Sequence, residues 1–71
     1  MNRALIINGT EKEFAETQWP ESVAELLHQL QIDQATVVAE IDGTIVERKD
    51  FSDTGVQEGQ SIELIRFVGG G

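Results

Sequence analysis

Three glycines, Gly69, Gly70 and Gly71, are the last residues of the sequence and its most informative chemical feature. Glycine has no Cβ and gains nothing from packing, so we expect residues 69–71 to form a slim, flexible tail. Such a tail can enter a narrow enzyme channel that any side chain would block. Its one unusual group is the terminal carboxylate of Gly71, so the reactive centre would be the end of the backbone itself.

A run of terminal glycines also has a plain interpretation, as a disordered remnant or a linker. Linkers usually mix serine with glycine, and this run contains none. Short motifs of this kind carry a real risk of false positives. The tail alone leaves both interpretations open, so the residues before it must decide between them.

The rest of the sequence offers few groups for catalysis. It has no cysteine, which excludes disulfides, thiolate metal sites and a cysteine nucleophile. The single histidine, His28, lacks a positioned carboxylate, and we expect it to be solvated, as are most loop acids such as Asp50 and Asp53. Trp19 is expected to pack at the entrance of a helix. We therefore predict that the chain is not an enzyme and binds no metal or cofactor itself.

Charge and length narrow the class of partner. The 71 residues carry 13 acidic and five basic side chains, for a formal net charge of −8. Phosphate backbones and anionic membranes repel such a surface, whereas a basic protein surface would be attracted to it.

A chain of this length forms one small domain, which we place at residues 1–68. Without a signal peptide or a segment of transmembrane length, we expect a cytoplasmic protein that is monomeric when free.

Two tight-turn dipeptides, Asn8-Gly9 and Asp42-Gly43, predict two β-hairpins. Five segments have the composition of strands: residues 4–7, 12–15, 36–41, 44–46 and 61–68. The second of these is short and polar, so we expect it at a sheet edge. Residues 47–56 are irregular, and Phe51 and Val56 are their expected apolar anchors.

One amphipathic helix lies between the hairpins. The apolar residues that recur at helical spacing are Val23, Leu26, Leu27 and Leu30. Ser22 and Glu25 have the spacing of a capping box, and Pro20 suits the approach to a helix. The helix needs a sheet to cover its apolar face.

This order of elements predicts an α+β fold, the ubiquitin-like β-grasp, in which one helix packs across a mixed sheet of four to five strands. The first and last strands would lie side by side at the centre and run parallel. Strand alternation then divides the apolar side chains between two faces. Facing the helix we expect Leu5, Ile7, Ile62 and Leu64.

On the uncovered face the same alternation places Ile6, Ile65 and Phe67, together and close to the root of the tail. An exposed apolar patch on a small acidic protein indicates a docking site. The competing interpretation is a register shifted by one residue, which would bury this set instead.

The sequence resembles the ThiS family, the sulfur carrier proteins of thiamine biosynthesis, over its whole length. The resemblance is carried by residues 22–27 (SVAELL), by residues 38–46 (VAEIDGTIV) with Glu47 and Arg48 after them, and by residues 56–68 (VQEGQSIELIRFV). The terminal Gly-Gly that defines the family maps onto Gly70 and Gly71. The second strand, with Trp19 and Pro20 after it, is longer and more polar than expected for the family.

The resemblance implies a mechanism. A ThiF-like adenylating enzyme would use ATP and Mg²⁺ to convert the Gly71 carboxylate to an acyl-adenylate, with Gly69 and Gly70 lying in its channel. Sulfur from a cysteine desulfurase would displace AMP and leave a terminal thiocarboxylate. That group would deliver sulfur to a ThiG-like thiazole synthase. The absence of cysteine fits, because an internal thiol could capture the activated terminus.

Three alternatives to a thiamine carrier stay open at the level of sequence. The small subunit of molybdopterin synthase has the same fold and terminus, although it is usually somewhat longer. A ubiquitin-like modifier would join its terminal glycine to lysines of other proteins. A plain interaction domain would carry an inert tail.

Overall fold

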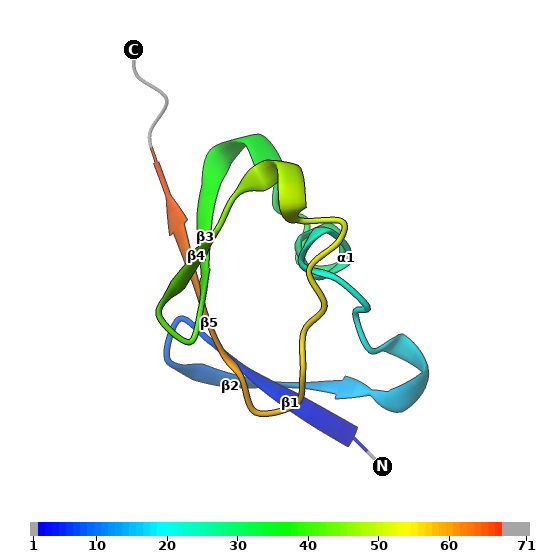
Figure 1. Ribbon diagram of the computed structural model, residues 1–71. Coiled ribbons are helices and arrows are strands. Elements are labelled where there is room, and N and C mark those ends of the chain that lie inside the picture. The colour runs from blue at the N-terminus through cyan, green and yellow to red at the C-terminus, as the bar shows by residue number, and fades with distance from the viewer. Residues whose placement is uncertain (1, 68–71) are drawn as a thin grey trace.

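The computed structural model describes residues 2–67, which form a five-stranded mixed sheet with one α-helix across one face (Figure 1). The strands are β1 (Asn2–Ile7), β2 (Thr10–Ala15), β3 (Val37–Ile41), β4 (Thr44–Val46) and β5 (Ser61–Arg66), and the helix is α1 (Val23–Gln29). Short 3₁₀ turns are η1 (Glu16–Gln18), η2 (Gln34–Thr36) and η3 (Arg48–Asp50). The predicted tail, Gly69 to Gly71, and Val68 lie outside the described residues.

The strand order is β2-β1-β5-β3-β4, so the last strand is central and the first lies beside it. β1 and β5 run parallel, β2 pairs antiparallel with β1, and the β3–β4 hairpin pairs antiparallel with β5 through β3. This is the predicted β-grasp arrangement, and β2 lies at an edge as expected. The end of β5 lies beside β3 and away from β1 and β2 (Figure 1).

Both hairpin turns have the predicted geometry. Asn8 and Gly9 have φ values of 51° and 81°, and Asp42 and Gly43 have 48° and 86°. Positive φ at both central residues is the requirement of a type I′ turn, which matches the twist of the strands it joins. The dipeptides therefore fix the register of each hairpin locally.

Helix α1 is closed at both ends by hydrogen bonds. At its start the Ser22 Oγ accepts from the Glu25 N–H at 3.1 Å, as predicted, but the Glu25 carboxylate accepts from the Glu21 N–H rather than from the N-cap residue itself. At its end Gln31 has a φ of 61°, and the Ile32 N–H donates to the Leu27 carbonyl at 2.9 Å. This is a Schellman closure built without glycine.

The apolar face of the helix is buried against the sheet, with Val23, Leu26 and Leu27 fully inaccessible to solvent. The irregular segment after β4 closes the core through Phe51, which is 1% exposed, and its backbone carbonyl accepts from the Ala24 N–H at 3.0 Å. Val56 is also buried, so both predicted anchors are confirmed.

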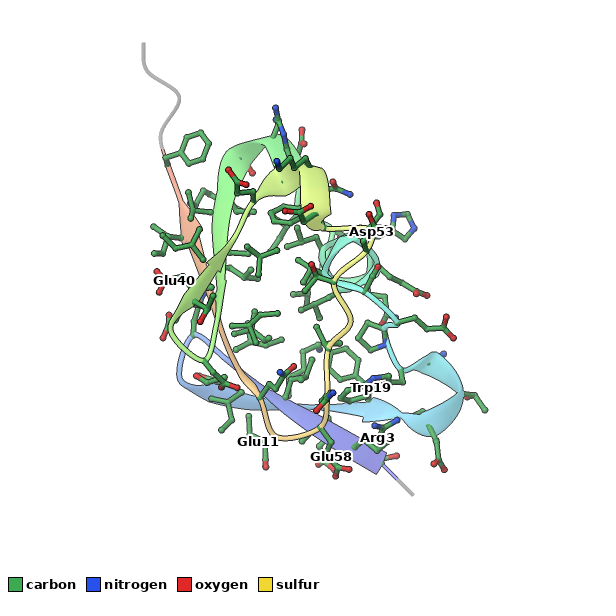
Figure 2. All side chains as sticks on the ribbon, in the orientation of Figure 1. Arg3, Glu11, Trp19, Glu40, Asp53 and Glu58 are labelled. Carbon is green, nitrogen blue, oxygen red and sulfur yellow. The ribbon has the colours of Figure 1, made fainter. Side chains whose placement is uncertain are left out.

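Trp19 packs at the helix entrance, as expected. Its indole N–H donates to the Val56 carbonyl at 3.2 Å, and its ring meets Phe14 edge-on at 5.7 Å. The Arg3 guanidinium lies 4.2 Å from the indole centroid and is also 3.6 Å from the Glu58 carboxylate (Figure 2). These contacts join β1, β2 and the loop before β5 at the end of the sheet opposite to the end of β5 (Figures 1 and 2).

Candidate functional site

The candidate site is the end of β5, where the chain leaves the sheet. β5 pairs with β3 over five residue pairs, from Ile62 opposite Ile41 to Arg66 opposite Val37. On its other side β5 pairs with β1 only at Ser61 and Ile62. Beyond β5, the Phe67 N–H still donates to the Thr36 carbonyl at 3.1 Å, so the last described residue is held on the sheet.

Asn8 replaces the missing strand on the open side of β5. Its backbone N–H donates to the Ile62 carbonyl at 2.9 Å, and its side-chain Oδ1 accepts from the Leu64 N–H at 2.8 Å. The side-chain amide thus continues the ladder of β1 by one further bond. Asn8 has two roles, since it also adopts positive φ in the hairpin turn.

Substituting Asn8 by alanine is expected to lower the free energy of unfolding by about 1–3 kcal/mol, because a half-buried N–H loses its acceptor and positive φ becomes strained. Asn8→Asp keeps the acceptor oxygen and tolerates the same φ, so it serves as the control. Urea unfolding together with amide exchange at Leu64 measures the effect. Equal stability of Asn8→Ala and wild type would show that this bond does not hold β5.

The predicted alternation along β5 is confirmed. Ile62 and Leu64 are buried against the helix, at 0% and 8% exposure, whereas Ile65 and Phe67 are about half exposed, at 49% and 50%. The alternative register, in which Phe67 would belong to the core, is therefore wrong.

The expectation that Ile6 lies together with Ile65 and Phe67 is wrong. Ile6 is exposed on the same face, but it pairs with Ser61, four residues before Ile65 along β5. At about 3.3 Å per residue the two isoleucines are roughly 13 Å apart. Glu63, on the same face, lies between them.

The side chains that do accompany Ile65 come from the β3–β4 hairpin, and the sequence reasoning missed them. Val38 is directly opposite Ile65 on β3, and Ile45 on β4 is the most exposed large apolar residue of the described chain, at 64%. We call the set Val38, Ile45, Ile65 and Phe67 the docking face. Val38 lies between Val37 and Ala39, which are both buried. Strand alternation could therefore have predicted that the Val38 side chain lies on the uncovered face.

The remainder of the uncovered face includes three acidic residues. Glu40 and Glu63 are directly opposite one another on β3 and β5, and Glu11 is opposite Ile6 on the β1–β2 hairpin. Figure 2 shows Glu40 and Glu11 on the side of the sheet away from α1. Like charges directly opposite each other destabilise a sheet, so this arrangement is not explained by stability alone. Val38 and Ile65 thus lie nearer the end of β5, and Glu40 and Glu63 lie one row further back, where Ile45 is directly opposite Glu40.

The other candidates from the sequence do not form a site. His28 is exposed on α1, and Asp50 and Asp53 lie exposed around η3. Within residues 2–67 no three histidine, aspartate or glutamate side chains gather where they could hold a metal ion. None of the helices formed by those residues has the length and apolar character needed to cross a bilayer.

The comparison with known families decides the identity of this arrangement, because the ThiS family model matches residues 5–71 and so includes the glycines together with the sheet. The chain belongs to the ThiS family. ThiS proteins are sulfur carriers of thiamine biosynthesis and are not themselves catalysts, so the predicted function class and the prediction of a non-enzyme are confirmed.

Two structures from Geobacter metallireducens have the same fold. A crystal structure of the thiamine biosynthesis protein ThiS is 36% identical, covers all of both chains and superposes with a TM-score of 0.77. A solution structure of a thiamine biosynthesis protein is also 36% identical, with a TM-score of 0.73 over all of this chain and 88% of that one.

A similar segment occurs within a longer protein. A thiazole synthase of Paramagnetospirillum magneticum is 33% identical over 67 residues, which are 94% of this ThiS chain but only 20% of that protein. The chain therefore spans about a fifth of the length of the curated relative it matches.

Proposed function

We propose that the Gly71 carboxylate is the group on which this ThiS protein carries sulfur. A ThiF-like enzyme transfers AMP from ATP, with Mg²⁺, to this carboxylate and releases pyrophosphate. The terminal sulfur of a cysteine desulfurase persulfide then attacks the acyl carbon, AMP leaves, and a second thiol cleaves the sulfur–sulfur bond to give the thiocarboxylate. ATP-dependent activation of this kind would take place in the cytoplasm.

The family match through residue 71 is the observation that supports this proposal. The chemistry of the chain agrees with it in two respects. A carboxylate is a poor electrophile until AMP provides a leaving group, and a chain without cysteine has no thiol of its own to intercept the acyl-adenylate. Delivery of the sulfur to a ThiG-like thiazole synthase is the step that the similarity to the Paramagnetospirillum protein supports.

Intact mass spectrometry after incubation with the activating enzyme, ATP and a sulfur source tests the proposal. We expect exchange of one terminal oxygen for sulfur. An isopeptide adduct would instead identify a protein modifier, and an unchanged mass would identify an inert tail. Transfer of the labelled sulfur to thiazole synthase, but not to molybdopterin synthase, would assign the pathway.

We further propose that the docking face binds the activating enzyme. Ile65 and Phe67 are its anchors beside the tail, and Gly69 and Gly70 occupy the narrow channel that leads to the nucleotide. Ile6 contacts the same enzyme through the acidic part of the face, where the surrounding glutamates attract a basic surface. The apolar anchors hold Gly71 at the reacting centre while the rest of the contact stays polar and reversible.

Truncating Phe67 to alanine is expected to weaken binding of the activating enzyme by about 2 kcal/mol or more, which is typical of an aromatic anchor. The half-exposed ring contributes little to the fold, so the melting temperature should stay nearly unchanged. Phe14→Ala is the matched control, because Phe14 is 5% exposed and its loss should reduce stability. Calorimetric titration and thermal melting measure the two effects. Loss of stability in Phe67→Ala with normal binding by the folded fraction would contradict the proposal.

A further inference from the structure

A groove with a volume of about 510 Å³ opens at the edge of the sheet beside Phe67. It exists because β4 is short and pairs with β3 only from Ala39 to Ile41, which leaves the start of β3 uncovered. The chain after β4 turns into η3 and forms the opposite wall. Among the residues that line the groove are Val37, Val38, Val46, Phe51, Phe67 and Arg48.

The groove continues the docking face around the edge of the sheet. Val38, Ile45 and Phe67 belong to both surfaces. Deeper in the groove, Val37 and Phe51 are buried core residues whose surfaces form its inner end. A partner that covers the docking face therefore meets an apolar recess into which one of its own side chains can insert.

Arg48 brings a positive charge to a groove that the Glu47 side chain also lines. The chain has a net charge of −8 and only five basic residues. Lys49, the next residue, lies 3.7 Å from the Glu47 carboxylate, whereas Arg48 makes no ion pair with any side chain of residues 2–67. A guanidinium at the side of an apolar recess has the geometry to pair with a carboxylate in two parallel hydrogen bonds.

We propose that this groove receives an apolar side chain of the activating enzyme, and that a carboxylate next to that side chain pairs with Arg48. The proposal rests on the proposed function and adds the chemistry by which the partner is recognised. The acidic part of the face, with Glu40 and Glu63, takes a basic surface of the same enzyme. Opposite charges at the two ends of one apolar surface fix the orientation in which the partner can dock.

The activating enzyme fits this site better than thiazole synthase does. In the Paramagnetospirillum relative the similar segment is part of the synthase chain, where it meets the synthase at high effective concentration and needs few contacts with it. The activating enzyme has to find the carrier by diffusion, so recognition by shape and charge falls to the surface of the carrier.

The test compares Arg48→Glu with Lys49→Glu in ATP–pyrophosphate exchange by the activating enzyme, with the concentration of the whole carrier chain varied. The two variants have the same net charge and differ by one position in η3, but Lys49 is not among the lining residues. We expect Arg48→Glu to raise the KM for the carrier by about tenfold or more with kcat unchanged, and Lys49→Glu to raise it by less than about threefold. Thermal melting should be the same for both.

Equal effects of the two variants on the KM would overturn the proposal. They would show that the charge of this region acts only by long-range electrostatic attraction of the enzyme, which added salt would abolish. No effect of either variant would overturn it as well. A lower KM for Arg48→Glu would show that the chain's own C-terminal residues occupy the groove and compete with the enzyme. A wild-type chain that supports no exchange would contradict the proposed function instead, so the two failures are distinguishable.

Ala35→Trp tests the apolar part separately, because Ala35 is an exposed residue that lines the groove. A tryptophan there should fill the recess and raise the KM to a similar extent, and Ala15→Trp, on exposed β2, is the control. A groove-filling variant with a normal KM would show that no side chain enters.

Discussion

Deleting Gly71 should abolish adenylation of this ThiS protein and leave its fold intact. The deletion moves the terminal carboxylate back by one residue, about 3.5 Å along an extended chain. Misplacement of a reacting group by as little as 1 Å can cost about a hundredfold in rate, so we expect at least that loss in ATP–pyrophosphate exchange. Within residues 2–67 the core extends from Leu5 to Leu64, and a glycine has no side chain to add to it, so circular dichroism and melting temperature should be unchanged.

Gly70→Trp tests the effect of a wider tail on adenylation separately from the effect of a shorter one. This variant keeps the terminal carboxylate at its original position in the sequence but adds a bulky side chain one residue before it. We expect exchange to be lost here too, because the narrow channel that we propose for the activating enzyme would admit only a backbone. Undiminished exchange by the Gly71-deleted protein would sink the carrier hypothesis, whereas loss only in the deletion would show that the channel is wide.

The elements that the sequence predicts well are those with local causes. Asn8-Gly9 and Asp42-Gly43 determine their turns through their own backbone preferences, and the structure has a type I′ turn at each. The buried face of α1 follows from the spacing of its apolar residues, and the two faces of β5 follow from alternation. None of these features depends on which strand lies next to which.

Element boundaries depend on neighbours, and here the sequence reasoning was less accurate. β1 begins at Asn2 and β2 at Thr10, because the ladder between them includes polar residues that have no strand signal of their own. The helix ends through Gln31 at positive φ, where a sequence search would look for glycine. Burial of Ile32 and Leu27 beside this closure offsets the strain.

The sequence predicts only part of the docking face: alternation places Val38, Ile65 and Phe67 on the uncovered side of the sheet, but not which exposed side chains lie next to one another. Whether Ile6 lies beside Ile65 depends on the register between β1 and β5, which are more than 50 residues apart in the sequence. No turn links them, and their register is fixed by side-chain packing and by the hydrogen bonds of Asn8 to Ile62 and Leu64, which form only in the folded protein. The presence of Val38 and Ile45 in the face likewise depends on pairing across β3, β4 and β5.

The position of Arg48 is a further consequence of tertiary structure. In the sequence it is one of several charged residues after β4, and the resemblance to ThiS includes it without a role. Only the short length of β4 and the turn of η3 bring it beside the uncovered start of β3. A recognition site of this kind forms where two elements end. The spacing of apolar residues within each element does not predict which side chains meet there.

Truncating Leu27 to alanine should destabilise the protein by about 2–5 kcal/mol, the range for large-to-small changes in a core. Leu27 is fully buried in the middle of the apolar face of α1. The substitution leaves a cavity between helix and sheet and also removes part of the core cluster against which Ile32 packs. For a domain of this size, 1 kcal/mol corresponds to roughly 4–8 °C, so the melting temperature should fall by at least about 8 °C.

His28→Ala is the matched control, because His28 is the next residue of the same helix and is exposed. We expect it to change the free energy of unfolding by no more than about 0.5 kcal/mol. Guanidinium unfolding of both variants measures the difference, and a midpoint for Leu27→Ala equal to that of wild type would mean that this face of α1 is not buried. A total stability of roughly 5–10 kcal/mol leaves little reserve after such a loss. The Leu27→Ala carrier should therefore lose activity in proportion to its unfolded fraction, whereas the Gly71-deleted carrier should be inactive while fully folded.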